Sequence, residues 1–284
     1  MPFKLDPSIL EGKSCSEYRI TPNALSKWDP SIQAKAADNT ISIYDVIGAD
    51  FWSGEGMTVK KMAGILRTFN NDDLIVNINS PGGDMFEGLA IYNLLREYKG
   101  RVTVNIVGIA ASAASIIAMA GDEIRISKSA FLMIHNCSVI VNGNRNTLSE
   151  VAEQLKPFDE AMAGIYMDKT GKSSSEILTM MDEETYINGA TAIEQGFADT
   201  YITSDEIEQT DLKPKSMIKQ LDTLLARSGM TRHDRRELFN QIKGTQNAAN
   251  SDTQNAVISA LAEIQHSINK LNGEQYNVRS IRYD

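Results

Sequence analysis

The sequence predicts an α/β domain with a mostly parallel sheet, and three observations lead to this fold class. First, residues 41–47, 74–79 and 102–107 form β-branched segments that are typical of buried strands. Second, segments with apolar residues at helical spacing lie between and after them, most clearly at residues 84–98. Third, strands that alternate with helices along a chain usually pair in parallel.

The alternation continues along the chain. Gly108 is expected to end the strand at 102–107, and small apolar residues predict a helix at 110–120 with Ser112 in its first turn. The remaining strands are expected at residues 123–128, 131–134 and 185–187. The remaining helices are expected at residues 57–69, 147–169, 174–181 and 190–196.

Changes in composition divide the chain into three parts. Residues 1–40 have no clear period and are expected to form an irregular N-terminal arm, followed by the α/β domain at 41–203. Residues 204–284 are expected to form a linker and a helical, scaffold-like tail. Within that tail, apolar residues at 257–271 follow a heptad pattern of about two repeats, which is short for an independent coiled coil.

Charge and composition exclude several classes of function. The formal net charge of −9 argues against a nucleic-acid-binding protein and, more weakly, against an anionic membrane surface as partner. No apolar run approaches 18 residues, and the N-terminus lacks the apolar core of a signal peptide, so a cytoplasmic protein is expected. Cys15 and Cys137 make neither a disulfide framework nor a zinc site. No metal or cofactor is therefore expected.

Three features fall at the carboxyl ends of predicted strands, where open α/β sheets place their functional sites. They are Gly82-Gly83, the segment 108–112 and His135. Ser112 lies among alanines at a helix N-terminus, where free backbone N–H groups can stabilise a developing oxyanion. The N–H groups of Ala113 and Gly83 are the candidate donors. Together these features suggest nucleophilic catalysis by Ser112.

Each feature also has a simpler structural interpretation. A Gly-Gly pair after a strand is more often a turn, and a helix of small residues more often serves close packing. A histidine after an apolar strand is more often a core residue, although His233 and His266 lie in polar surroundings and are poorer candidates for a base than His135. Ser115 is the rival serine, expected to lie one turn deeper. Three carboxylates, Asp182, Glu183 and Glu184, could complete a triad.

Taken together and in order, five motifs resemble the proteolytic subunit of the Clp protease family, peptidase family S14. The resemblance covers about residues 41–203. The motifs are INSPGGD (78–84), GIAASAAS (108–115), AMAGD (118–122), LMIHN (132–136) and ETYINGATAIEQGFAD (184–199).

The resemblance implies a fold, an activity and a set of site residues. The fold would be a spiral of strand–strand–helix units with a helical C-terminal extension, and the activity would be serine endopeptidase cleavage without a cofactor. The family acid is usually Asp two residues before an aromatic, which here places Glu184 before Tyr186, with Asp182 as second choice. The remaining roles fall on Ser112 as nucleophile, His135 as base, and Gly83 and Ala113 as oxyanion-hole amides.

More narrowly, the chain resembles the phage-encoded branch that matures proheads. The arm with Trp28, the segment WSGEGMT (52–58) and the helical tail point there. This branch implies phage capsid or scaffold protein as substrate, within an assembling prohead in the host cytoplasm. The family also implies a homo-oligomeric ring, with residues 142–170 matching the handle helix. No segment matches the axial hairpin that contacts an unfoldase, so an ATP-dependent partner is not expected.

Three other functions remain as alternatives. A housekeeping Clp proteolytic subunit would share the chemistry, but it would not need the C-terminal tail. A crotonase-type acyl-CoA enzyme shares the spiral fold and a two-amide oxyanion hole, but it requires no Ser–His pair at Ser112 and His135. A scaffolding protein with a protease-derived domain would explain the heptads at 257–271, although an intact Ser–His pair does not favour it.

Overall fold

The computed structural model describes residues 20–30, 32–34, 39–49, 56–139, 141–203, 207–209 and Leu238. The chain divides into two units, Met1–Asp211 and Leu212–Asp284, and every described residue except Leu238 belongs to the first. The predicted heptads at 257–271, most of the WSGEGMT segment and the start of the arm lie outside the described residues. None of the described helices is long and apolar enough to cross a bilayer.

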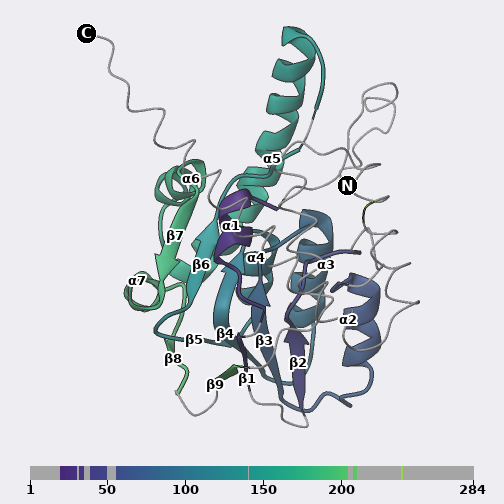
Figure 1. The fold of residues 1–284 in the computed structure, drawn as a ribbon, viewed down its shortest axis with the longest axis vertical. Helices are drawn as coiled ribbons and strands as arrows, with labels where there is room; N and C mark the ends of the chain where they lie inside the picture. The colour runs from purple at the N-terminus through teal and green to yellow at the C-terminus, as the bar shows by residue number, and fades with distance from the viewer. Residues whose placement is uncertain are drawn as a thin grey trace. The chain divides into compact units, whose positions relative to one another are not determined.

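Seven helices and nine strands make up the described part of the chain (Figure 1). The helices are α1 (Pro22–Lys27), α2 (Val59–Leu66), α3 (Met85–Arg96), α4 (Ala113–Ala118), α5 (Arg145–Thr170), α6 (Ser174–Asp182) and α7 (Gly189–Glu194). The strands are β1 (Ile32–Ala34), β2 (Thr40–Ile43), β3 (Leu74–Ser80), β4 (Val102–Ala111), β5 (Glu123–Ile126), β6 (Phe131–Ile134), β7 (Thr185–Asn188), β8 (Thr200–Tyr201) and β9 (Ile207–Gln209).

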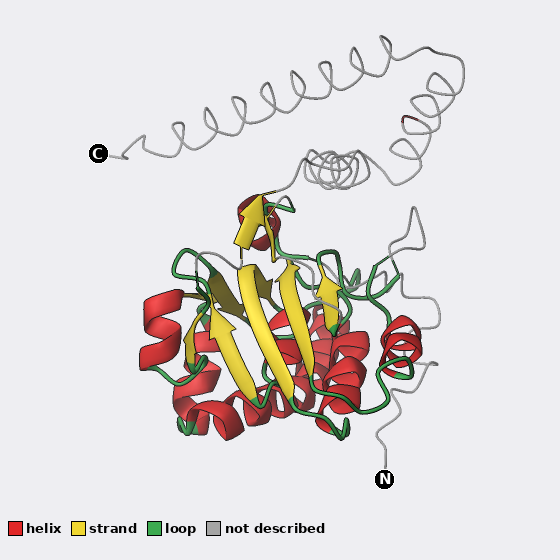
Figure 2. Cartoon of the chain, turned by 90° about the horizontal axis from the view of Figure 1, so that it is seen from below, coloured by secondary structure: helices red, strands yellow, loops and turns green. Residues whose placement is uncertain are grey.

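The predicted α/β class with a mostly parallel sheet is confirmed. Strands β2, β3, β4, β5 and β8 are parallel neighbours in that order, and β6 also pairs in parallel with β4. Only β7 joins this seven-stranded sheet in the antiparallel direction, through β6. Figure 2 shows the strands side by side with helices packed against them. The two inner strands β3 and β4 are buried along most of their length, as expected for a sheet with covered faces.

Strand β4 pairs with β3 on one side and has two successive neighbours on its other side. Residues Thr103–Ile106 pair with β5, whereas residues Ile109–Ala111 pair with β6. The expectation that Gly108 ends this strand is therefore wrong. Gly108 instead allows the Asn79 side chain to approach the backbone, since a Cβ at this position would lie 2.6 Å from Asn79 Oδ1. The longer strand carries the chain to Ser112 beside the end of β6.

The arm is more regular than its sequence predicts. It contains helix α1 and strand β1, and β1 pairs with β9. Helix α1 has only six residues, so it shows no helical period, but Thr21 caps it by accepting a hydrogen bond from the Ala24 N–H. Pro22 in the first turn suits a helix start. In the sequence, the capping residue Thr21 indicates this helix, whereas the spacing of apolar residues does not.

A buried tryptophan holds the arm against the main sheet. Trp28 is 4% exposed and packs in a cluster with Ala111 and Met133, which pair across β4 and β6, and Ala111 directly precedes Ser112. Its Nε1–H donates to the Asn79 carbonyl at 2.9 Å. The Asn79 amide in turn donates to the carbonyls of Asp29 and Ile32. The arm is therefore part of the packing behind Ser112.

We predict that Trp28→Ala lowers the free energy of unfolding by about 3–5 kcal/mol, because it removes a large buried ring and leaves the Asn79 carbonyl without its donor. Trp28→Phe should cost less, since it keeps most of the packing. The matched control is Val139→Ala, an exposed apolar residue, which should stay within about 0.5 kcal/mol of wild type. Chemical denaturation measures all three. Equal losses in Trp28→Ala and Val139→Ala would show that the arm is not anchored.

Candidate active site

Ser112 occupies a sharp junction between β4 and α4. It is the N-cap of α4, with φ 55° and ψ −125°, so the expected place in the first turn of a helix starting at 110 is wrong. A positive φ costs a serine on the order of 1–3 kcal/mol and is common where a side chain must be presented at a functional site. The Ser112 N–H donates to the Met133 carbonyl at 2.9 Å, and its carbonyl accepts from the Ser115 N–H at 2.9 Å. These bonds hold the strained residue from both sides.

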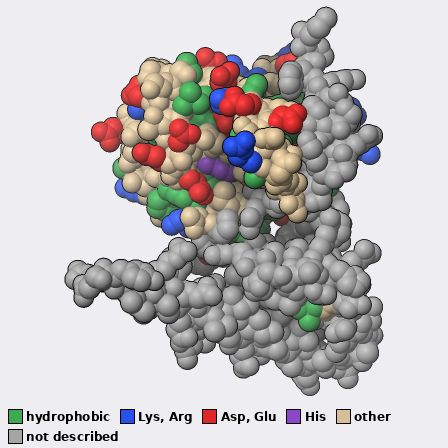
Figure 3. All heavy atoms as spheres, turned by 90° about the horizontal axis from the view of Figure 1, so that it is seen from above, with side chains coloured by type: hydrophobic (Ala, Val, Ile, Leu, Met, Phe, Trp, Pro, Cys, Tyr) green, Lys and Arg blue, Asp and Glu red, His purple; other side chains and the backbone are tan. Residues whose placement is uncertain are grey.

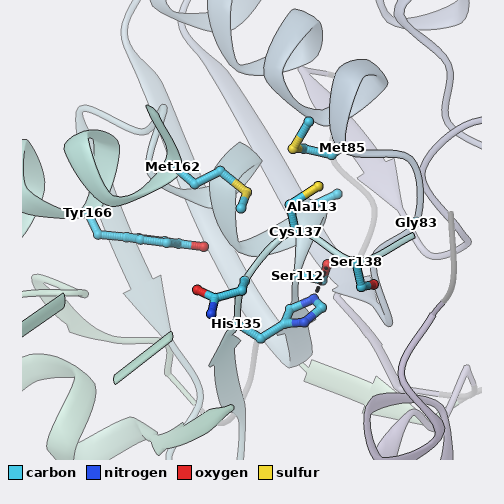
Figure 4. Close-up of a pocket in the computed structure, with 10 residues that line it drawn as sticks. Gly83, Met85, Ser112, Ala113, His135, Cys137, Ser138, Met162 and Tyr166 are labelled. Atoms are coloured by element: carbon cyan, nitrogen blue, oxygen red, sulfur yellow. Dashed lines mark hydrogen bonds between the residues drawn. The ribbon is translucent and has the colours of Figure 1, made fainter. Parts of the chain in front are cut away.

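The structure brings Ser112 and His135 into direct contact. Strand register places Ala111 opposite Met133. Ser112 directly follows β4 and His135 directly follows β6, so the two residues come together at one edge of the sheet. The Ser112 Oγ lies 2.7 Å from His135 Nε2 (Figure 4). This distance is normal for an O–H···N hydrogen bond. A neutral imidazole that carries its proton on Nδ1 accepts a hydrogen bond from the Ser112 hydroxyl through Nε2. This is the arrangement expected for a nucleophile beside its base.

The surroundings of His135 favour its neutral form. Burial lowers the pKa of His135 below its usual value, and the negative charge of Glu184 opposes this shift in part. Burial is the larger effect. An imidazole with a lowered pKa is unprotonated at neutral pH and is therefore available to take a proton.

Glu184 reaches the site through the antiparallel pairing of β6 and β7. Ile134 lies opposite Thr185, so the residues just beyond this pair are His135 and Glu184. Glu184 has a positive φ of 51°, and its Oε1 is buried with no hydrogen-bond partner among the described residues. It makes no direct hydrogen bond to His135 in this structure. Catalytic hydrogen bonds are often longer without substrate than with it.

Asp182, the second choice for the acid, is directed elsewhere. It is exposed at the end of α6, and its Oδ1 accepts a hydrogen bond from Asn136 Nδ2 at 2.7 Å. Glu183, the third carboxylate, is exposed and caps the same helix. Among the three candidates, Glu184 is the one whose charge acts on His135.

The two candidate oxyanion donors line the same pocket as Ser112. Ala113 is the first residue of α4, and Gly83 lies on the neighbouring loop after β3, where it bridges to Ile47. Gly83 has φ 152°, and a Cβ there would collide with the Ile47 carbonyl, so only glycine fits. Neither N–H has a hydrogen-bond partner among the described residues. Unpaired N–H groups beside a nucleophile are available to stabilise negative charge.

A pocket beside Ser112 extends the site with residues that the sequence analysis did not single out. Its side chains come from three elements, as Figure 4 shows: Met85 from α3, Met162 and Tyr166 from α5, and Cys137 from the segment after β6. The sequence could have indicated Met85, because it lies only two residues after the Gly82-Gly83 pair. Tyr166 and Met162 lie far along the chain and reach the pocket only because α5 packs beside α4.

The surroundings of Cys137 and Ser115 make both side chains poor candidates for a nucleophile. Burial raises the pKa of the Cys137 thiol to about 11, with Asp159 and Asp84 adding to the shift, so the thiol stays protonated. Ser115 is fully buried, as its place one turn deeper predicts. Figure 3 shows a histidine side chain at the surface, with both basic and acidic side chains nearby.

Comparisons with known proteins give one consistent family. The chain is 25% identical over 200 residues to the ATP-dependent Clp protease proteolytic subunit of Mesostigma viride, covering 66% of this chain and 87% of the relative. It is 31% identical over 127 residues to the subunit of the same name from Deinococcus radiodurans, covering 44% of this chain and 62% of the relative.

The fold agrees with these similarities. A ClpP1 mutant from Listeria monocytogenes superposes with a TM-score of 0.50 at 21% identity, covering 59% of this chain and 94% of the other. Residues 55–205, more than half of the chain, match the family described as Clp protease. The chain is therefore a peptidase that belongs to the Clp protease family.

Proposed function

We propose that this chain is a serine endopeptidase in which Ser112 is the nucleophile and His135 its general base. The observation that carries the proposal is the 2.7 Å contact between Ser112 Oγ and His135 Nε2. It is supported by the lowered pKa of His135, which leaves the ring free to accept a proton, and by the strained backbone that presents Ser112. The crotonase-type alternative requires none of these features.

In the first step, Ser112 Oγ attacks the carbonyl carbon of the scissile peptide bond while its proton passes to His135 Nε2. The carbonyl oxygen becomes an oxyanion, which the N–H groups of Gly83 and Ala113 stabilise. The tetrahedral intermediate collapses, the amine leaves with the proton from His135, and an acyl ester remains on Ser112. Water then attacks the ester with His135 again as base, and this releases the carboxylate product and restores the hydroxyl.

Glu184 completes the proposed triad. Its negative charge favours the protonated imidazole, so it stabilises the imidazolium that forms during each attack. Strand register supports the assignment, because the β6–β7 pairing places Glu184 beside His135 whereas Asp182 binds Asn136. The Glu184 Oε1 has no hydrogen-bond partner among the described residues, so it is available to accept a hydrogen bond from His135 during the reaction.

For the biological context, we propose that the substrate is phage capsid or scaffold protein and that the enzyme acts during prohead maturation. The support is the sequence resemblance in the Trp28 arm, the WSGEGMT segment and the tail after residue 203. The curated relatives named above are proteolytic subunits of ATP-dependent proteases. The missing match to an axial hairpin favours a function without an unfoldase for this chain.

We further propose that the chain works as a homo-oligomer through α5. The first half of this helix extends away from the sheet in Figure 1, and its side chains are mostly exposed, including Leu148 at 46%. Only Val151 is buried there, whereas Met162, Ala163 and Tyr166 fix the second half to the core. A helix with unpaired apolar residues is suited to packing against another chain.

We predict that Ser112→Ala lowers kcat/KM for peptide cleavage by about 10⁴-fold or more, because no other group can form the acyl ester. A fluorophosphonate probe should label wild type at Ser112 and leave the variant unlabelled. Ser129→Ala, which removes an exposed hydroxyl outside the pocket, should behave as wild type. Labelling at Ser115 or Ser138 in the Ser112→Ala variant, found by peptide mapping, would reassign the nucleophile.

The lowered pKa of His135 predicts the pH dependence of activity. Activity requires the neutral imidazole, so kcat/KM should fall with decreasing pH through a midpoint below 6.5. Glu184→Gln removes the charge that raises this pKa, so the midpoint should move to still lower pH. The plateau should also fall, by about 10²-fold or more, because the imidazolium loses its counter-charge.

The control for this experiment is Asp182→Asn, since Asp182 binds Asn136 and does not act on His135. It should keep the wild-type midpoint and a rate within about threefold, the scale of a surface substitution. Steady-state assays between pH 4.5 and 9, with buffer conditions matched, give both quantities. The opposite ranking of the two variants would make Asp182 the acid.

Co-expression tests the proposed substrate. Wild type produced together with the capsid and scaffold proteins of the phage or prophage that encodes it should cleave at least one of them, and Ser112→Ala should leave both intact. Intact-mass spectrometry of the assembled particles detects the cleavage. If both proteins keep their full mass with an active protease, the prohead function is wrong, although the peptidase chemistry stands.

A further inference from the structure

A buried chain of hydroxyl groups connects helix α5 to the backbone of the nucleophile. Ser115 Oγ lies 2.6 Å from the Ser112 carbonyl oxygen and 2.7 Å from the Tyr166 hydroxyl. Ser115 is fully buried and Tyr166 is 1% exposed. The proposed reaction uses neither side chain directly, yet both stand one contact away from the residue that reacts.

The direction of these hydrogen bonds follows from the chemistry of the groups. A carbonyl oxygen can only accept, so the single proton of the Ser115 hydroxyl points to Ser112 O. The Tyr166 hydroxyl must then donate to Ser115 Oγ. Burial raises the pKa of Tyr166, so the phenol keeps its proton and remains a donor across the working pH range. The relay therefore runs from Tyr166 through Ser115 to the Ser112 carbonyl.

The carbonyl that ends this relay shares a peptide plane with the Ala113 N–H. The peptide bond is planar and trans, so its C=O and N–H point in opposite directions. A donor that holds the Ser112 oxygen on one side therefore aims the Ala113 N–H to the other. Besides the Ser115 hydroxyl, the N–H groups of Ser115 and Ile116 reach the same oxygen, at 2.9 and 3.3 Å.

The peptide plane between Ser112 and Ala113 must be held in place by hydrogen bonds, because the backbone of Ser112 is strained. With φ 55° and ψ −125°, the residue lies outside the conformations that serine prefers, and rotation of the Ser112–Ala113 peptide could relieve the strain. Rotation would turn the Ala113 N–H out of the site. It would also take the acceptor away from the Ser115 hydroxyl, and an unpaired hydroxyl proton is unfavourable in a buried core. The relay thus opposes the rotation that would dismantle the oxyanion hole.

We propose that Ser115 and Tyr166 are positioning residues that aim the Ala113 N–H at the reacting oxyanion. This inference rests on the proposed function, because it assigns Ala113 as an oxyanion donor. It adds two side chains from outside the triad and gives Ser115, the rival serine of the sequence, a different role. It also makes the packing of α5 against α4 a condition for catalysis, since Tyr166 comes from α5.

The test compares binding of a transition-state analogue with binding of a ground-state ligand. A peptide aldehyde forms a hemiacetal with Ser112 and needs the oxyanion hole, whereas the matching peptide alcohol does not. Ser115→Ala should weaken aldehyde inhibition and lower kcat by the same factor, about 10-fold, less than the loss of a whole oxyanion donor. KM and the affinity for the alcohol should stay unchanged.

Tyr166→Phe is the milder variant, because it removes one hydroxyl and keeps the ring that packs near Phe197. It should lower kcat and the affinity for the aldehyde by about threefold. A variant with both Ser115→Ala and Tyr166→Phe should be no worse than Ser115→Ala alone, because the effects of coupled groups are not additive. Thr170→Val is the matched control. It removes a hydroxyl from the same helix that bonds to the Tyr166 carbonyl but not to Ser115. It should match wild type in both measurements.

The outcomes separate this inference from the proposed function. If wild type forms no adduct with the aldehyde at Ser112, the proposed function is wrong and the relay has no catalytic role. If wild type is inhibited, and Ser115→Ala and Tyr166→Phe are inhibited equally well, only the relay is wrong. The relay is also wrong if KM and alcohol binding change as much as kcat, or if Thr170→Val loses as much as Tyr166→Phe.

Discussion

The whole site depends on strand β4 having two partners in succession. Its first half pairs with β5 and its second half with β6, so the sheet divides along β4 and the ends of β4 and β6 emerge together. Ser112 and His135 are the residues that follow these two strands, and their contact is a consequence of register. Asn79 supports the arrangement from β3, because its Oδ1 accepts the Ile109 N–H beside Gly108, where β4 changes partner.

The strained backbone of Ser112 requires a well-packed and fully bonded environment. The Ser112 carbonyl accepts from two backbone N–H groups and the Ser115 hydroxyl, and the Ser112 N–H is bound by Met133. Trp28 closes the opposite side of the sheet by packing on Ala111 and Met133. The arm, β6 and α5 therefore all support the backbone of Ser112, each through a different contact. Such convergence is the usual condition under which a positive φ persists outside glycine.

The sequence predicted most of the sheet and the residues of the proposed triad, because buried strands have clear composition and the family motifs are specific. Three parts could not be predicted, each for a physical reason. Helix α1 is too short to show a period, and the extension of β4 through Gly108 depends on a tertiary contact with Asn79. The bond between Tyr166 and Ser115 joins residues 51 positions apart, and no local pattern encodes it.

Among the strands that the structure describes, β7 pairs with β6 alone, so the residues of the proposed triad are not held equally firmly. Its four residues pair with β6 alone, whereas β4 is held on both sides. Separation of one short ladder would carry Glu184 away while Ser112, His135 and the loop of Gly83 kept their places. Sub-global opening of this kind costs less free energy than unfolding of the core. Glu184 is thus the most easily released part of the site, and Ser112 the least.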